Sequence, residues 1–256
     1  TSFKLQNGLT IYLMEQHDVP VISFSAILPA GAIYDFDKAG LASLTADALK
    51  HGTKNFTKNQ IDEELDFVGA NVNTYATKEF AGIASKFVAK DTNKVLAIIK
   101  ELLLAPSFNS DEFEKEKSRL LVGLEQKKES PRGVIKDYYD KFLFGNHVYG
   151  NVTDGSISSV RKLTVDDLKA FYQANYSPTD AAISIVGDFS TIEMKKTLTK
   201  LFSEWQKKPS SVKNLASEKI DAPISNNVLL VNKEDANETT FYIGSLGISR
   251  NNVDYV

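Results

Sequence analysis

Apolar and polar positions alternate near the start of the chain, and this pattern predicts β-strands. Leu9, Ile11 and Leu13 alternate with polar or aromatic neighbours, and an Asn-Gly pair before them is typical of a tight turn. We therefore expect residues 3–14 to form a β-hairpin. Residues 21–28 are an almost continuous apolar run, which predicts a second strand that is buried on both faces.

A helix is predicted within residues 39–53. Leu41, Leu44 and Ala48 recur at helical spacing, and Gly52 follows them as a stop signal.

Further periodic segments continue this mixed order of strands and helices. They predict strands at residues 71–77, 80–88 and 181–186, the last of them buried, and helices at residues 57–67, 91–104, 110–129, 131–144, 164–172 and 192–205. The order predicts an α+β fold, in which helices cover a mixed, largely antiparallel β-sheet.

The composition changes after Trp205, which predicts a domain boundary. Residues 1–206 are expected to form a first domain, and the polar residues 207–222 to form a linker. Residues 223–256 resemble the opening strands again, since residues 228–231 repeat the apolar character of residues 11–14 at an offset of 217. We expect them to begin a second, homologous domain that continues beyond the end of this sequence.

Composition narrows the function classes. The 256 residues are 42% hydrophobic and 25% charged, with a net charge of −3, as in ordinary globular domains. Charges of both signs are interspersed, so a nucleic-acid partner is not expected. No apolar run reaches the length of a membrane span, and the absence of cysteine excludes disulfides and Cys-ligated metal.

Several segments resemble the M16 metallopeptidases, the family of pitrilysin, insulinase and mitochondrial processing peptidase. The segments occur in the family's order and at its intervals: AGLA and GT at the two ends of residues 39–53, LDFVGANVNTY at residues 65–75, the long helix after Pro106, HVYG at residues 147–150 and YSPTDAAISIVGD at residues 176–188. The resemblance covers essentially the whole chain and implies the M16 fold.

The resemblance also implies where a zinc site would lie. The M16 helix carries an inverted H-x-x-E-H motif, and a glutamate on a distant helix supplies the third ligand. Here Ser43 and Asp47 stand at the two histidine positions, and Ala46 stands at the position of the general-base glutamate. The aligned long helix places Gly123, 76 positions after Asp47, where the third ligand belongs.

These replacements remove the chemistry of the motif. A catalytic zinc site needs three protein ligands and an open position for water, and Ser43, Asp47 and Gly123 together offer one carboxylate. Without the metal and the base, no water is activated for hydrolysis. We expect no zinc cofactor in this chain and no peptidase activity of the chain alone.

Other residues have a functional and an ordinary interpretation. The resemblance implies that Asn73, Thr74 and Tyr75 lie on an edge strand beside an extended peptide substrate, although Asn73 could equally be a solvent-facing polar residue. Glu116 matches an acidic family position or is a surface residue. His51 could join Asp47 as an unconventional metal ligand, but it is also well placed for a charged residue at a helix C-terminus.

Three functions remain open at this stage. The first is a catalytically inactive M16 subunit that forms a substrate chamber with an active partner carrying H-x-x-E-H, with zinc only in that partner. The second is a structural or assembly scaffold, like the core subunits of the cytochrome bc1 complex. The third is a zinc endopeptidase with unconventional ligands. The resemblance favours the bacterial periplasm or cell envelope as the location.

Overall fold

The computed structural model describes residues 1–207, 227–234, 237–249 and 252–255. Its centre is one six-stranded sheet in the order β1-β2-β6-β3-β5-β4. The strands are β1 (Ser2–Lys4), β2 (Thr10–Glu15), β3 (Val21–Leu28), β4 (Asn71–Ala76), β5 (Ala81–Val88) and β6 (Ala182–Gly187). Only β2 and β6 pair in parallel, and the other neighbours are antiparallel, so the predicted largely antiparallel α+β sheet is confirmed.

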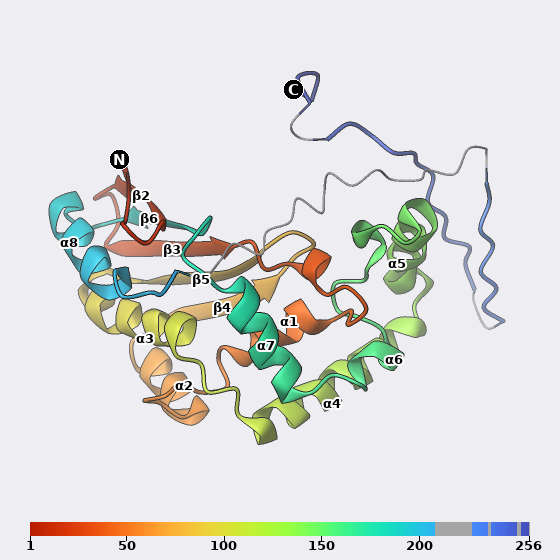
Figure 1. The fold of residues 1–256 in the computed structure, drawn as a ribbon, viewed down its shortest axis with the longest axis horizontal. Helices are drawn as coiled ribbons and strands as arrows, with labels where there is room; N and C mark the ends of the chain where they lie inside the picture. Colours follow the sequence, from red (N-terminus) through yellow and green to blue (C-terminus); the bar gives the residue numbers. More distant parts are fainter. Residues whose placement is uncertain (208–226, 235–236, 250–251, 256) are drawn as a thin grey trace.

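Helices pack beneath and beside this sheet, with α5 off to one side (Figure 1). They are α1 (Leu41–Ala48), α2 (Lys58–Phe67), α3 (Thr92–Leu104), α4 (Ser110–Lys128), α5 (Pro131–Phe144), α6 (Ile157–Val160), α7 (Val165–Asn175) and α8 (Thr191–Phe202). Short 3-10 turns lie at η1 (Ala32–Tyr34), η2 (Ala89–Asp91) and η3 (Val148–Gly150). The predicted positions of the first hairpin, the β4–β5 hairpin and the long helices agree with these bounds to within a few residues.

One face of the sheet forms the core, and this corrects the prediction that residues 21–28 are buried on both faces and limits the predicted burial of residues 181–186 to one face. In β3, Ile22 and Phe24 are buried, whereas Ser23 is exposed and Ile27 is 41% exposed. β6 alternates in the same way, with Ser184 exposed. An apolar run cannot by itself reveal whether a second layer covers the sheet, because strand side chains alternate between faces whatever their type.

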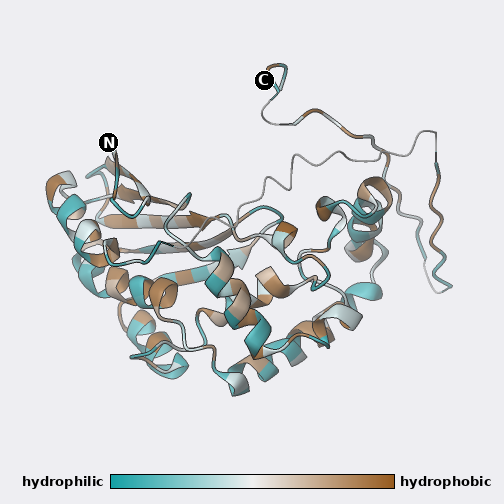
Figure 2. Ribbon diagram, in the orientation of Figure 1, coloured by the Kyte–Doolittle hydropathy of each residue, from teal (hydrophilic) through white to brown (hydrophobic). Residues whose placement is uncertain are grey.

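The core lies between the inner face of the sheet and the helices. Leu96, Ile99 and Leu103 of α3 are fully buried there, as are Leu198 and Phe202 of α8. Figure 2 shows that the helices carry hydrophobic and hydrophilic stretches, as expected for elements with one side in a core. Burial of these side chains supplies the main stabilisation of the fold.

Helix starts follow the capping rules at most positions. Thr57 and Gln60 form a reciprocal capping box at the start of α2, and the Asn109 side chain caps α4. Asp91 precedes α3, but its side chain makes no capping hydrogen bond. The preceding 3-10 turn η2 leads directly into this helix, so Asp91 does not have the extended backbone of an N-cap residue.

The predicted second domain stays a prediction. Most of the predicted linker falls outside the described residues, and among residues 227–234 and 237–249 none is in a strand. This part of the chain contacts α5: Arg132 pairs with Glu238 at 3.1 Å, and the rings of Tyr139 and Tyr242 lie 5.5 Å apart.

Among the described helices, none combines the length and the hydropathy needed to cross a bilayer.

Candidate functional site

Asp35 holds the start of α1, the helix that carries the altered zinc motif. Gly40 precedes the helix in a left-handed conformation (φ 98°) and has no side chain to cap it. The carboxylate of Asp35, which is 2% exposed, accepts hydrogen bonds from the backbone N–H groups of Gly40 at 2.9 Å and Ala42 at 2.8 Å. Sequence patterns do not reveal this residue because it lies outside the spacing of an ordinary N-cap.

A loop after η3 brings a second carboxylate to the same helix. Ser43 Oγ donates to Asp154 Oδ1 at 3.5 Å, across 111 positions of sequence. The adjacent Gly155 permits this approach, since its φ is 77° and a Cβ there would lie 2.4 Å from the carbonyl oxygen of Ala39. Neither Asp154 nor Gly155 belongs to a motif that the sequence singles out.

Ser43 and Asp47 lie one helical turn apart and are both half-buried, whereas Ala46 is fully buried. Burial raises the pKa of Asp47 to about 6, and the nearby carboxylates of Glu116 and Asp154 add to the rise while Lys50 opposes it. Glu116 therefore lies near the altered motif, as its family position implies.

The third ligand position lies on α4, which contacts α1. Gly123 is seven positions after Glu116, so the two residues lie on the same side of α4. Gly123 is exposed. Apart from its chain neighbours and the nearby backbone of its own helix, no atom lies within 4 Å of the position that a Cβ would occupy. This position therefore has room for a longer side chain and presents only backbone.

The residues present do not fit a catalytic zinc ion. Ser43, Ala46, Asp47 and Gly123 contribute a hydroxyl, a methyl, one carboxylate and no side chain, where three ligands and a base are needed. Within the part of the chain that the structure describes, no group of three His, Cys, Asp or Glu side chains could hold a metal ion.

His51 follows α1 and is only 7% exposed. Burial lowers the pKa of His51, although the charges of Glu116 and Glu112 act in the opposite direction. Burial therefore disfavours the charged form of His51 that would interact with the helix dipole, although His51 lies just beyond the C-terminal end of α1, as predicted. Its Nδ1 atom is buried without a hydrogen-bond partner among the described residues.

The other two histidines are not simply solvated, in contrast to the ordinary expectation for turns and loops. His17 is exposed, but its ring lies between Asp188 at 2.6 Å and Glu15 at 3.0 Å. His147 accepts a hydrogen bond from the backbone N–H of Tyr149 and so caps η3.

The predicted substrate residues lie on β4, which is an edge strand of the sheet and contacts α1. Asn73 is exposed on the face away from the helices, and Tyr75 covers Gly82 of β5 on the same face. Thr74 points to the opposite face and is 4% exposed. Its side chain is therefore inaccessible, and only its backbone could meet a peptide.

Comparison with known families agrees with this architecture. Residues 12–154 match the family model described as Insulinase (Peptidase family M16), and residues 162–256 match the model described as Peptidase M16 inactive domain. The first of these matches includes α1, β4 and α4, and therefore every position of the altered zinc motif.

Three curated relatives differ in what their names say. A Rickettsia bellii protein named as an uncharacterized zinc protease is 26% identical over 98% of this chain and 60% of its own length. Bovine cytochrome b-c1 complex subunit 1 is 26% identical over 78% of this chain and 42% of its own length. The Helicobacter pylori non-peptidase homolog YmxG is 27% identical over 76% of this chain and 47% of its own length. The chain thus spans about half the length of these relatives.

A solved structure shares the fold. The peptidase M16 inactive domain from Pseudomonas fluorescens has a TM-score of 0.79 and 24% sequence identity, over 83% of this chain and 52% of that one. Together with a family match that covers more than half of the sequence, this shows that the chain belongs to peptidase family M16.

Proposed function

We propose that this chain is a catalytically silent M16 subunit that forms part of a substrate chamber with an active, zinc-bearing partner. In such an assembly the partner carries H-x-x-E-H and performs hydrolysis, because one metal suffices for the reaction while a closed chamber needs two halves. This chain then contributes chamber wall and peptide binding.

One observation carries the proposal. The fold keeps α1 and α4 in contact, yet all three ligand positions and the base position on them have lost their chemistry. Asp47 is the acidic residue among the four, so these positions offer a single carboxylate. Loss of a single ligand could be compensated by a neighbour, but none of the described residues completes the set.

The edge of β4 supports the peptide-binding part of the proposal. Among the described strands β4 pairs with β5 alone, so its other side offers backbone N–H and C=O groups to an extended peptide. Asn73 is exposed beside that edge and can hydrogen-bond a peptide main chain.

The relatives support a silent subunit without identifying its partner. The match to an M16 inactive domain and the similarity to a protein named as a non-peptidase homologue favour loss of catalysis. The similarity to a cytochrome b-c1 subunit favours the second candidate, a structural scaffold. The similarity to a protein named as a zinc protease favours the third, although Asp47 and His51 would need a further ligand.

Co-expression with an M16 protein that carries the intact motif separates the first two candidates. We expect a stable complex in which peptide cleavage exceeds that of the active partner alone. Purification with an unrelated membrane complex, and no effect on any M16 peptidase, would support the scaffold instead.

Peptide binding is measured with the chain by itself. Fluorescence anisotropy of a labelled, extended peptide should show weaker binding by the Asn73→Ala variant, by about two- to tenfold for one lost hydrogen bond. The matched control is Gln173→Ala, an exposed amide on α7. Equal affinities of the wild type and both variants would remove Asn73 from the proposed site.

A further inference from the structure

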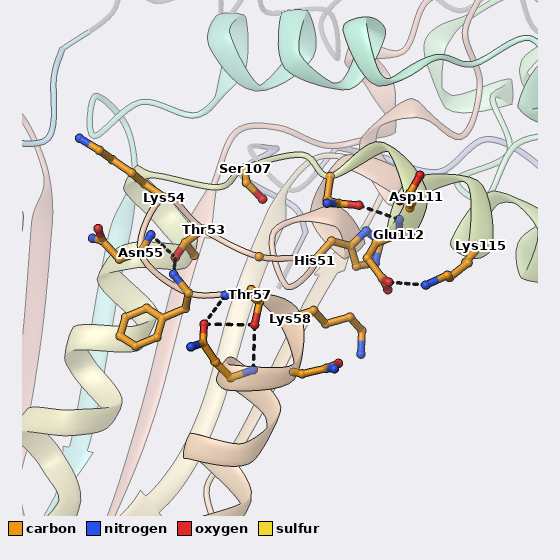
Figure 3. A pocket seen from close by; sticks show the side chains of 15 residues that line it. His51, Thr53, Lys54, Asn55, Thr57, Lys58, Ser107, Asp111, Glu112 and Lys115 are labelled. Carbon is orange, nitrogen blue, oxygen red and sulfur yellow. Dashed lines mark hydrogen bonds and ion pairs between the residues drawn. The ribbon is translucent and has the colours of Figure 1, made fainter.

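A polar cavity and an apolar helix both lie away from the altered zinc motif. The cavity has a volume of about 490 Å³ and is bounded by the loop between α1 and α2 and by the starts of α2 and α4 (Figure 3). Side chains in its wall bond to one another: Lys115 pairs with Glu112 at 2.6 Å, and Thr57 Oγ1 donates to Gln60 Oε1 at 3.1 Å. The helix is α5, whose apolar side chains are only partly covered by the described residues.

The apolar side chains of α5 lie outside the hydrophobic core. Seven of its 14 residues are large and aliphatic or aromatic, among them Ile135, Tyr138 and Leu143. None of the seven belongs to the core formed by the described residues or packs against it, and Tyr138 is 48% exposed. The buried residue of α5 is instead the charged Asp140. A surface helix normally turns its apolar side to the core, so α5 departs from the usual pattern.

Charged side chains hold α5 against the rest of the domain. Asp137 pairs with Lys127 of α4 at 2.6 Å, and Asp140 pairs with Lys78 at 3.1 Å. The helix also contacts η3. These contacts attach α5 to the domain and leave most of its apolar side chains for a further partner.

The segment at residues 227–249 carries a second uncovered apolar surface. In its described parts, Leu230, Phe241 and Ile243 are 89%, 76% and 88% exposed. Exposed apolar side chains that gather along one segment are typical of a surface that another folded unit covers. This segment therefore needs a partner for the same reason as α5.

The two apolar surfaces meet at Tyr139. Its ring lies 5.5 Å from the ring of Tyr242, and a Cβ at Gly244 would lie 2.1 Å from its hydroxyl oxygen. Glycine therefore permits the segment to approach the helix this closely. Arg132 and Glu238 form an ion pair at 3.1 Å across the same contact. Figure 1 shows α5 and this segment at the end of the molecule opposite α8, so the two surfaces lie together.

We propose that α5 and residues 227–249 form the docking surface for a second domain of the same polypeptide, the homologous domain that residues 223–256 are predicted to begin. The surface already includes the segment that leads into that domain, and such a tether gives a high effective concentration. One family model matches residues 162–256, from before α7 through this segment, which supports a continuous unit. The docking requires the predicted second domain and is independent of the proposed zinc-bearing partner.

Thiol labelling tests the docking, because the chain contains no cysteine and each introduced thiol reports alone. Tyr138→Cys places a probe on α5, and Lys200→Cys places a control at an exposed position of α8. Each variant is prepared in the 256-residue chain and in the full natural polypeptide, with any cysteine beyond Val256 replaced by serine. Circular dichroism checks that the variants fold.

The Tyr138→Cys thiol should react with a maleimide about tenfold or more slowly in the full polypeptide, because covered thiols are inert. The Lys200→Cys thiol should react equally in both polypeptides. A second probe, Ile243→Cys on the segment, should be protected like Tyr138→Cys, and the docking requires the protection of both.

Three results would overturn the proposal. The first is equal reactivity of the Tyr138→Cys thiol in the two polypeptides, even where the second domain is folded. The second is a natural polypeptide that ends at Val256. The third is protection in the 256-residue chain that increases with protein concentration, which would assign the surface to a second copy.

Discussion

Two carboxyl groups at α1 are held in an environment that favours their protonated form. Burial raises the pKa of Asp35 to about 7 and that of Asp47 to about 6, against ordinary values of about 4. For Asp35, the N–H groups at the start of α1 act in the opposite direction. A carboxyl whose pKa is higher in the folded state stabilises the fold below the unfolded-state pKa, and this stabilisation is lost as the pH rises through the folded-state pKa.

The Asp47→Asn variant tests the effect of the raised pKa of Asp47 on the unfolding free energy. In the wild type, the contribution of Asp47 to the unfolding free energy should fall between about pH 4 and pH 6 as its carboxyl is forced to ionise, and then level off, while Asp35 lowers the unfolding free energy of both proteins up to about pH 7. The variant should lack that fall and gain about 1–3 kcal/mol relative to the wild type at pH 7. Urea unfolding at a series of pH values measures the difference.

The control for Asp47 is Glu114→Gln, an exposed acid on α4. It should follow the wild-type pH dependence. An Asp47→Asn variant that is less stable than the wild type at pH 7 would contradict the assignment, because it would show that the ionised carboxylate is favoured in the folded protein.

Asp35 has a structural role that a second variant isolates. Asp35→Ala leaves the N–H groups of Gly40 and Ala42 buried without their acceptor, so it should lower the unfolding free energy by about 1–3 kcal/mol. Thermal unfolding measures this loss. Asp37→Ala changes an exposed acid two positions away and should have little effect; equal effects of the two substitutions would show that Asp35 does not hold the helix.

Among the individual site residues, the sequence predicts only those that occur at a recognisable local spacing. Ser43, Ala46, Asp47 and Gly123 are identified because the family motif fixes their positions. Asp35 and Asp154 reach the same helix through tertiary contacts, and neither occurs at a diagnostic spacing. Thr74 is grouped with Asn73 and Tyr75 in the sequence, but strand alternation turns its side chain to the core.

Among the elements, the β4–β5 hairpin is attached at its tip to α5 and η3. Lys78 Nζ donates to the carbonyl oxygens of Tyr149, at 2.8 Å, and Asn151, and it pairs at 3.1 Å with Asp140. Asp140 is only 7% exposed, and these contacts offset part of the cost of burying its carboxylate. The attachment fixes one end of the strand that carries Asn73.

The Lys78→Met variant keeps the length of the side chain and removes its charge. We expect a loss of about 1–3 kcal/mol of unfolding free energy, because two carbonyl groups and a buried carboxylate lose a donor. Lys136, which also pairs with Asp140, limits the loss. Lys86→Met, on the same hairpin but exposed and without an ion pair to any residue that the structure describes, is the control for urea unfolding. Equal midpoints for both variants would refute the attachment.

His17 connects the loop after β2 to the loop between β6 and α8. Hydrogen bonds with Asp188 and Glu15 raise the pKa of His17. Its stabilising contribution should be complete below about pH 6.5 and should disappear as the pH rises through the raised pKa. NMR should give a titration midpoint above 6.5 that Asp188→Asn lowers. Asp18→Asn, which changes an adjacent acid, should leave it in place; a wild-type midpoint at or below 6.5 would contradict these contacts.

The existence and type of most elements could be predicted from the sequence, since apolar periodicity and capping residues are local. Thr57 with Gln60 and Pro131 mark helix starts that the structure confirms. The burial of β3 on one face could not be predicted, because it depends on which layers cover the sheet. The one-turn helix α6 is too short to give a periodic signal.

Across the whole molecule, one sheet face packs against helices, while the other presents small and polar side chains at its centre. Ser25, Ser184 and Ala84 are cross-strand neighbours there, in the same row as Asn73. The chain spans about half the length of the relatives it matches, and the proposed substrate chamber needs a second, zinc-bearing subunit. Catalysis in that chamber would depend on where a metal is held.

The zinc content of the purified chain is the most direct test of the claim that the altered motif holds no catalytic zinc. The chain is incubated with excess zinc, freed of unbound metal by gel filtration and analysed by elemental mass spectrometry. Ser43, Asp47 and Gly123 cannot complete a ligand set, so the account predicts zinc far below one ion per chain and no chelator-sensitive cleavage of peptides. One tightly bound zinc ion per chain, lost together with peptidase activity in the Asp47→Ala variant, would contradict it.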